Sequence, residues 1–511
     1  MLTTSNPACP PLDRPVGTDD GTAARPGPRA RGWAVLAALA IVYAAIFVAY
    51  YPPTLGIEDE VGYLNQALVW SHGAVSAGGA GFHDLMGFVT IGGREVAVRQ
   101  PGRSLAMLPF LLAGRPSSVF LSGLLLHLAT VAAGGAVLAR LGRSPVWAVL
   151  LLCHPTLALY SRTLMADEGA GLGIVLAALA VATTARPLMG AWAAAATVLG
   201  ALMRYHVGLS LPFVAAAFRF PPARPRPLRE VALCLVTGGL GGALIVAYNL
   251  WLYHHPTDPS PAARGLWSTG YIVTQAPFYA SALMLIWPGM LLAPVLDRSV
   301  IRWMVRGVCG LYLLMFLSYY WHDQGAGWVE TAVLGQRLIQ VALPLWVVSY
   351  AGVVDDLVMV PLRRRLGAAT ARTMTALVCA GLLVATTMLF ARHQAHLRTL
   401  VAVRDAVAAA VPDGACLAAN GTVQKLFGVA TGRPSYRWVY LPDTAAGRHL
   451  PADLGTSPWY VAVLAKVPDD PTLADARATA ARFGMVPIAT SIPGLVVYIS
   501  RPALPAPGPP P

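Results

Sequence analysis

From Trp33 to Asn65 the sequence reads WAVLAALAIVYAAIFVAYYPPTLGIEDEVGYLN. Its first part is an apolar run long enough to cross about 30 Å of hydrocarbon. Three consecutive carboxylates, Glu58, Asp59 and Glu60, follow shortly after that run ends. Ionisable groups are costly beside a membrane and are therefore candidates for function. The stretch predicts an integral membrane protein with an acidic site at the water edge of its first span.

The rest of the chain has the composition of a membrane protein. Of its 511 residues, 56% are hydrophobic and 12% are charged, and the mean hydropathy of +0.58 is too high for a soluble chain of this size. Apolar stretches predict an all-α polytopic membrane fold with about eleven transmembrane helices. They are expected at 33–51, 117–139, 145–160, 167–185, 188–203, 206–218, 231–252, 276–296, 304–320, 338–354 and 373–390.

Arginines set the expected orientation, because short loops rich in Lys and Arg stay on the cytoplasmic side. Clusters such as Arg140 with Arg143, and Arg363 with Arg364 and Arg365, fall in alternate loops. This pattern predicts a cytoplasmic N-terminus and an extracytoplasmic C-terminus in the cell membrane. The formal charge of +13 is explained by this bias, and no basic patch with interleaved aromatic residues indicates nucleic-acid binding.

Composition divides the chain into segments. The membrane domain includes a long outer loop that is expected to carry helices along the membrane, and the chain beyond it alternates between strand and helix patterns. That alternation predicts a small extracytoplasmic α/β domain, and the Pro-rich ends predict disordered tails. The expected segments are a cytoplasmic tail at 1–32, the membrane domain at 33–390 with its outer loop at 52–116, the α/β domain at 391–501 and a tail at 502–511.

The acidic stretch has two faces if the chain is helical from Ile57 onward. The apolar stripe holds Ile57, Val61, Leu64 and Leu68. The second stripe, about 200° away around the axis, holds Asp59, Tyr63, Gln66 and Trp70. Asp59 would then face away from lipid, where its carboxylate could act as a general base. An interfacial helix whose acids only face water is the alternative interpretation.

A second acidic pair, Asp167 and Glu168, opens the fourth predicted span after a short outer turn. Negative charge is favoured at a helix N-terminus by the dipole and by free N–H groups, so capping would be a sufficient structural explanation. Two acidic sites that emerge at the same membrane face nevertheless define a polar cavity. Both residues are therefore functional candidates.

Two arginines, Arg204 and Arg337, lie on the expected outer face, against the general charge bias. A guanidinium group there can bind a phosphate through two hydrogen bonds. It can also reach lipid headgroups without any substrate. Both interpretations remain open from the sequence.

No metal site is predicted. The pairs His83–Asp84 and His322–Asp323 could ligate a metal, but an isolated His-Asp pair is a weak signal and a hydrogen-bonded loop is the simpler interpretation. The six cysteines are scattered and define neither a disulfide framework nor a metal-binding motif.

Five segments occur in an order that is typical of a known family. They are 59–63, 99–104, 161–167, 248–271 and 321–344, the last with Gly335-Gln336-Arg337-Leu338 inside it. In this order they resemble the polyprenyl-phosphate-sugar-dependent glycosyltransferases of the GT-C fold class, which include protein O-mannosyltransferases and bacterial aminoarabinose transferases. The resemblance covers about residues 33–350. Glu58, which makes the first motif a triple acid, and Gln336, where several relatives have proline, leave the subfamily and the acceptor undefined.

The resemblance implies an inverting transfer of a sugar from a polyprenyl-phosphate carrier to a glycan, lipid or protein acceptor at the outer face. Asp59 would take the proton of the acceptor hydroxyl, and Asp167 would position the acceptor or Asp59. The leaving phosphate would be stabilised by Arg204 and Arg337. The remaining substrate-binding candidates are Glu60, Tyr63 and Glu168. No cofactor is firmly implied, although family members differ in whether they use a divalent cation.

Two other classes of protein remain open. A transporter or a lipid-linked-sugar flippase would also be polytopic and basic inside, but the sequence shows no repeated halves with matching broken helices. An envelope scaffold could use the outer domain for binding, yet it would not require acids at both Asp59 and Asp167. Transfer of sugar to an acceptor would distinguish the first class from these alternatives.

Overall fold

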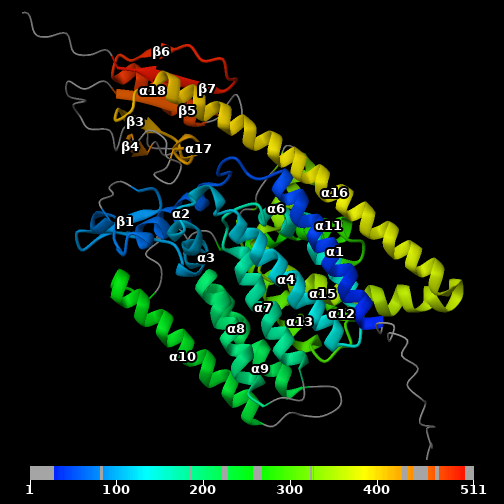
Figure 1. Cartoon of the computed structure of the whole chain (residues 1–511). Helices are drawn as coiled ribbons and strands as arrows, with labels where there is room; N and C mark the ends of the chain where they lie inside the picture. Colours follow the sequence, from blue (N-terminus) through cyan, green and yellow to red (C-terminus); the bar gives the residue numbers. More distant parts are fainter. Residues whose placement is uncertain are drawn as a thin grey trace, which may run out of the picture.

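We describe the protein from a computed structural model (Figure 1). The described residues are 28–80, 85–183, 187–220, 228–256, 267–320, 322, 325, 327–427, 436–440, 459–465 and 471–500. The expected tails therefore lie mostly outside the described residues, as do the pair His83–Asp84 and the residue Asp323. Residues 28–32 are not part of a disordered tail, because helix α1 (Pro28–Ala49) already begins at Pro28.

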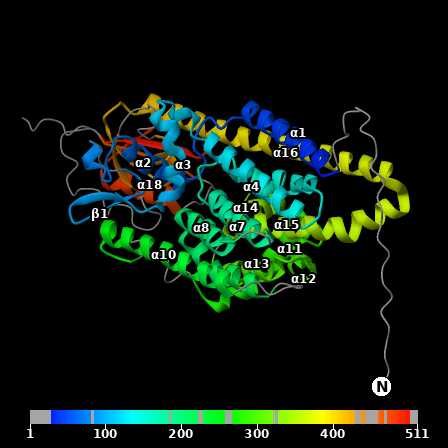
Figure 2. The same cartoon turned by 60° about the horizontal axis from the view of Figure 1, so that its bottom comes forward.

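The membrane part is a bundle of helices that share one apolar core, from Leu36 of α1 to Phe390 of α16. Figures 1 and 2 show α1 and α16 running together along one edge of the bundle and α10 along another. The remaining helices are α4 (Leu121–Arg140), α5 (Val149–Leu152), α6 (Pro155–Tyr160), α7 (Asp167–Ala182), α8 (Met189–Met203), α9 (Leu211–Arg219), α10 (Leu228–Tyr253), α11 (Ile272–Ile286), α12 (Ala293–Leu296), α13 (Arg302–Leu317), α14 (Trp328–Gly335), α15 (Leu343–Val354) and α16 (Val360–Ala410).

Several apolar helices confirm a multi-pass membrane protein. Within the described residues, 4 helices are long and apolar enough to cross a membrane, or up to 5 when the bent pair that contains α11 is counted as one span. Other apolar helices are shorter; α7, for example, has 16 residues and α8 has 15. Helices of that length fall below the roughly 20 residues of a full span, so the expected count of about eleven is not confirmed.

The central helices α7 and α8 pack at very short range. A side chain added to Gly173 of α7 would lie 2.7 Å from the Cα atom of Gly200 in α8. Small residues at such crossings allow membrane helices to touch through their backbones. This contact fixes the start of α7, which carries Asp167, relative to the end of α8, which is followed by Arg204.

The long loop before α4 folds into α2 (Glu58–Ser71), the hairpin of β1 (Phe88–Ile91) and β2 (Arg94–Ala97), and α3 (Pro101–Leu112). Helix α2 is not an exposed interfacial helix with one face open to water. Tyr63 and Gln66 on its second stripe are buried, because α3 covers them and the Ser104 hydroxyl donates to the Tyr63 carbonyl and to Gln66. Glu58 and Asp59 in the first turn of α2 remain partly exposed, as do Leu68, Trp70 and Ser71 at its other end.

The C-terminal part forms a five-stranded sheet in the order β4-β3-β5-β7-β6. β3 pairs in parallel with β4 and β5, whereas β7 pairs antiparallel with β5 and β6. The elements are β3 (Cys416–Ala419), α17 (Gly421–Gln424), β4 (Arg437–Tyr440), β5 (Trp459–Leu464), α18 (Pro471–Arg482), β6 (Val486–Ile488) and β7 (Leu495–Ile499).

The sheet is packed onto the end of α16 (Figure 1). Leu397, Leu400 and Val403 of α16 share an apolar core with the sheet residues Leu417 and Tyr460. The expected domain boundary at residue 391 therefore falls inside a continuous helix. Residues 391–410 of α16 and the sheet form one packed body, here called the C-terminal body.

Candidate functional site

Asp59 lies between two arginines. Its Oδ1 accepts a hydrogen bond from Arg99 Nη2 at 2.5 Å, and its Oδ2 accepts one from Arg337 Nη2 at 2.5 Å. Arg99 stands just before α3, and Arg337 belongs to the short 3-10 helix Gln336–Ile339 before α15. The Asp59 side chain is 28% exposed. Three distant segments thus meet at one carboxylate that remains accessible from outside.

The two arginines determine the charge state of Asp59. Burial alone would raise the pKa of the Asp59 carboxyl, but Arg337, Arg99 and the nearby Arg204 outweigh it and lower the pKa to about 2. The group is therefore ionised at every physiological pH. A carboxylate with so low a pKa is a weak base, so Asp59 cannot accept a proton effectively while both arginines hold it.

A second ion pair joins Asp167 and Arg204. Arg204 Nε donates to Asp167 Oδ1 at 3.0 Å and Nη2 donates to Oδ2 at 2.7 Å, which is the two-pronged geometry that a guanidinium favours. The two side chains are 6% and 17% exposed. The predicted interpretation of Asp167 as a simple helix cap is incomplete, because its carboxylate binds this arginine.

Tyr63 lies between the two ion pairs. Arg99 stacks 5.8 Å from the centre of its ring. Burial raises the pKa of the Tyr63 phenol, while Arg204 and Arg99 partly oppose that rise and Asp59 and Asp167 add to it. The charges of both pairs therefore act on one phenol. Five candidates predicted from the sequence form one cluster with Arg99: Asp59, Tyr63, Asp167, Arg204 and Arg337.

In the cluster formed by these ion pairs, positive charge exceeds negative charge. Arg99, Arg204 and Arg337 contribute three guanidinium groups, and Asp59 and Asp167 contribute two carboxylates. Arg99 was recognised in the sequence only as part of a proline-containing motif. Its pairing was missed because it lies 40 residues from Asp59 in the sequence. The excess of one positive charge favours an anionic ligand.

The acids next to the two aspartates are buried under the site. Glu60 is 1% exposed; its Oε2 accepts from the backbone N–H groups of Gly56 and Ile57, and its Oε1 accepts from that of Leu164. These bonds tie the start of α2 to the turn before α7. Glu60 therefore has no oxygen directed at the open side of the cluster.

Glu168 is bound inside the bundle. It is 1% exposed and contacts His127 Nδ1 at 2.8 Å and Gln340 Nε2 at 3.0 Å. His127 Nε2 lies 3.1 Å from the Leu152 carbonyl oxygen. Both ring nitrogens of His127 thus lie within hydrogen-bond distance of an oxygen atom. Neither His127 nor Gln340 was predicted, because a histidine and a glutamine inside apolar helices carry no motif.

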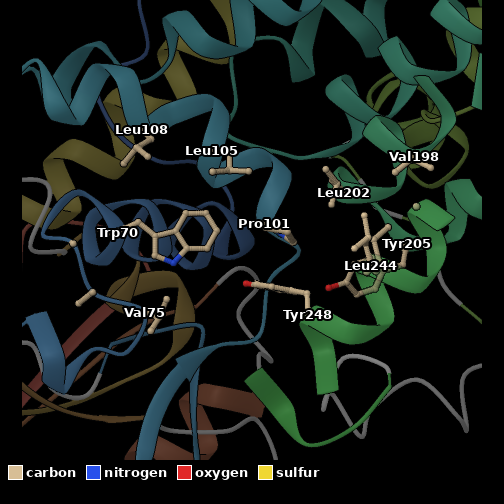
Figure 3. Close-up of a pocket in the computed structure, with 14 residues that line it drawn as sticks. Trp70, Val75, Pro101, Leu105, Leu108, Val198, Leu202, Tyr205, Leu244 and Tyr248 are labelled. Atoms are coloured by element: carbon tan, nitrogen blue, oxygen red, sulfur yellow. The ribbon is translucent and has the colours of Figure 1, made fainter. Parts of the chain in front are cut away.

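An apolar cavity of about 630 Å³ opens beside the cluster, between α2, α3, α8 and α10. Figure 3 shows Trp70 and Leu105 on one side of it and Leu202 and Leu244 on the other. It adjoins the charged cluster at two points, since Pro101 follows the Arg99-Gln100 pair and Tyr205 follows Arg204. The lining residues are Trp70, Gly73, Ala74, Val75, Pro101, Leu105, Leu108, Val198, Leu202, Tyr205, Gly241, Leu244, Ile245 and Tyr248.

In the part of the chain that the structure describes, no three His, Cys, Asp or Glu side chains gather to hold a metal ion. His322 instead stacks on Phe278 and lies 2.9 Å from Gln275. The oxygens of Asp59 and Asp167 are bound to arginines.

No protein-family model matches the chain, and no curated protein matches it by sequence. Solved structures are nevertheless similar to it. ArnT from Cupriavidus metallidurans bound to undecaprenyl phosphate has a TM-score of 0.57 at 13% identity, covering 94% of this chain and 100% of that one. The arabinofuranosyltransferase AftD from Mycobacteria has a TM-score of 0.50 at 14% identity, covering 92% of this chain and 40% of that one. The chain therefore has the GT-C fold.

Proposed function

We propose that the protein is a membrane glycosyltransferase that moves a sugar from a polyprenyl-phosphate carrier to an acceptor hydroxyl. The observation that carries this proposal is the junction of an arginine-rich cluster with an apolar cavity of about 630 Å³. A polyprenyl phosphate has the matching chemistry, with an anionic head on a long hydrocarbon tail. The similarity to ArnT, whose structure was solved with undecaprenyl phosphate, supports the same class of donor.

We place this site at the extracytoplasmic face. Arg337 precedes α15, whereas Asp355 and Asp356 follow α15 and pair with Arg363 and Arg143 in the arginine-rich loops. The positive-inside rule assigns those loops to the cytoplasm. The N-terminal tail would then lie inside the cell, and the C-terminal sheet would lie outside beside the site.

In this mechanism Asp59 is the base and the arginines receive the leaving phosphate. The acceptor oxygen gives its proton to Asp59 and bonds to the anomeric carbon as the bond from that carbon to the phosphate oxygen breaks, with inversion. The fixed guanidinium groups stabilise the charge on the departing phosphate. Because the phosphate competes for Arg99 and Arg337, donor binding would release Asp59 and raise its pKa, which makes it a stronger base.

The other candidates support these two roles. Arg204 would share the phosphate, and its partner Asp167 would position either Arg204 or the acceptor. Glu60 and Glu168 would act as buried supports rather than as substrate ligands, since their oxygens already bind other groups. Tyr63 would hold Arg99 in place through the contact with its ring.

The direct test is transfer from a panel of radiolabelled polyprenyl-phosphate sugars by purified protein in lipid vesicles, with cell-envelope glycans, lipids and a hydroxyl-rich peptide as acceptors. We expect label in one acceptor from one donor, without any ion or substrate gradient. Movement of the lipid-linked sugar between leaflets without transfer would instead support a flippase and reject the proposal.

Filling the apolar cavity should selectively weaken the binding of donors with a long hydrocarbon chain. We expect Leu105→Trp to reduce the affinity for undecaprenyl phosphate by about 10-fold, because the larger ring occupies the space of the tail. Affinity for the short geranyl phosphate should be unchanged. Leu125→Trp, at an exposed position on α4 outside the cavity, is the control. If Leu105→Trp lost the same affinity for undecaprenyl phosphate and for geranyl phosphate, the tail would have to bind outside this cavity.

A further inference from the structure

The segment from Tyr50 to Ile57, here called the strap, joins α1 to α2 and so positions Asp59. Its carbonyl groups are bound by side chains from distant parts of the chain. Arg162 donates to the Tyr50 carbonyl, and Gln394 of α16 donates to that of Tyr51 at 3.1 Å. Lys425 Nζ donates to the Gly56 carbonyl at 2.7 Å. The C-terminal body thus holds the strap at two points.

Lys425 is an unusual residue in this chain. The sequence contains only two lysines, Lys425 and Lys466, among its 37 basic residues. Lys425 is also 7% exposed and directly follows α17, where its ammonium group leaves the C-terminal sheet and reaches the strap. Burying an ammonium group is costly unless it is paired or hydrogen-bonded. Its position therefore indicates a specific contact with its surroundings.

The segment of α17 and Lys425 lies beside both acids that flank Asp59. Burial raises the pKa of Glu60, while the N–H groups of Leu164, Ile57 and Gly56, together with the charge of Lys425, partly oppose that rise. The Glu58 carboxyl lies against Gly421, where an added side-chain carbon would be 2.5 Å away. The C-terminal body therefore contacts the residues on both sides of Asp59 in the chain.

We propose that Lys425 is a positioning residue for Asp59, through which the C-terminal body sets the first turn of α2. This inference rests on the proposed function, since it assigns a role in that reaction. Lys425 donates to the Gly56 carbonyl, its charge favours the ionised form of Glu60, and Glu60 accepts the N–H groups of Gly56 and Ile57. Asp59 then meets Arg99 and Arg337. The C-terminal body contributes to transfer without supplying a group that touches the donor.

The charge of Lys425 is the testable part of this role. Without it, the pKa of Glu60 rises further, and a protonated Glu60 is a poorer acceptor for the two strap N–H groups. Activity needs Glu60 as a carboxylate, so activity is lost as the pH falls through its pKa. The acid limb of the kcat profile should therefore move to higher pH when Lys425 is neutralised.

The experiment compares Lys425→Met, Lys425→Arg and wild type in the full-length protein in lipid vesicles. For Lys425→Met we expect kcat at neutral pH to fall by about 10-fold, with the acid limb shifted upward and the affinity for undecaprenyl phosphate unchanged. Lys425→Arg keeps the charge and should restore most of kcat and the original limb. Arg398→Met is the control. It removes an exposed charge from the part of α16 that belongs to the C-terminal body, and it should behave as wild type.

The outcomes separate this inference from the proposed function. Wild-type protein that transfers no sugar contradicts the proposed function. Wild-type protein that transfers, beside a Lys425→Met variant with normal kcat and an unshifted limb, rejects the positioning role. A lower kcat with an unshifted limb and no rescue by arginine also rejects it, because simple loss of packing explains that result. If Lys425→Met fails to bind undecaprenyl phosphate, Lys425→Gln is tested in its place by the same criteria. Glutamine is neutral but can still donate a hydrogen bond.

Discussion

Replacing Asp59 by asparagine should abolish sugar transfer and at the same time tighten the binding of the polyprenyl-phosphate donor. Transfer should fall by about 10³-fold, because an amide cannot take the proton of the acceptor hydroxyl. Binding should tighten because the Asp59 carboxylate occupies Arg99 and Arg337 in the absence of a ligand. Opposite effects of one substitution on kcat and on affinity are the specific sign of this arrangement.

The size of the affinity gain follows from the hydrogen bonds between Asp59 and the two arginines, which the phosphate would no longer have to displace. A hydrogen bond to a charged group contributes about 1.5–3 kcal/mol, so releasing one arginine should tighten the dissociation constant by about 10-fold. The measurement is the equilibrium binding of undecaprenyl phosphate to wild type and Asp59→Asn at neutral pH. Undecaprenol, which lacks the phosphate, should show no difference between the two proteins.

Two results would contradict this account of Asp59. Weaker donor binding by Asp59→Asn would mean that the carboxylate helps to bind the phosphate. Full transfer by Asp59→Asn would remove Asp59 from the role of base. The pKa gives an independent check: the Asp59 carboxyl, with a pKa of about 2 in the free protein, should bind a proton at higher pH once undecaprenyl phosphate occupies the arginines, and the carboxyl infrared band that is lost in Asp59→Asn would report it.

The sequence predicted the acidic and basic members of the site but not their pairing. Asp59 and Glu60 are adjacent and share the same chemistry, yet a turn of about 100° around the helix axis separates them. One consequently meets two arginines, and the other accepts three backbone N–H groups. A residue's neighbours in space, such as Arg337 for Asp59, depend on packing between segments 278 residues apart.

The fold was predictable to a similar depth. Apolar stretches located long helices such as α1 and α10, because membrane insertion depends mainly on composition and length. They did not show that, after a kink at Gly367, α16 continues to Ala410 and joins the bundle to the sheet, because its outer part has the mixed polarity of a helix packed on one side. The contact of Lys425 could not be predicted from the sequence either, because its partner Gly56 lies 369 residues away.

Replacing Arg337 by methionine should weaken donor binding by about 100-fold, the largest loss of affinity that we expect from one substitution in the site. Methionine keeps much of the apolar stem and removes the charge and the planar fork. Arg337 is also the neighbour that lowers the pKa of Asp59 most, so its loss should raise that pKa. Binding of undecaprenyl phosphate should become less sensitive to salt, because one fewer cation attracts the phosphate.

The controls distinguish the effect of the planar guanidinium group of Arg337 from the effect of a positive charge in general. Arg392→Met removes an arginine that is 73% exposed on α16 and pairs with Glu330, and it should leave donor affinity unchanged. Arg337→Lys keeps the charge but loses the two-pronged geometry, so its affinity should fall between those of wild type and Arg337→Met. Equal affinity in wild type and Arg337→Met would mean that Arg337 serves only to hold Asp59. The phosphate would then have to bind Arg204 and Arg99, and the excess positive charge of the cluster would have another purpose.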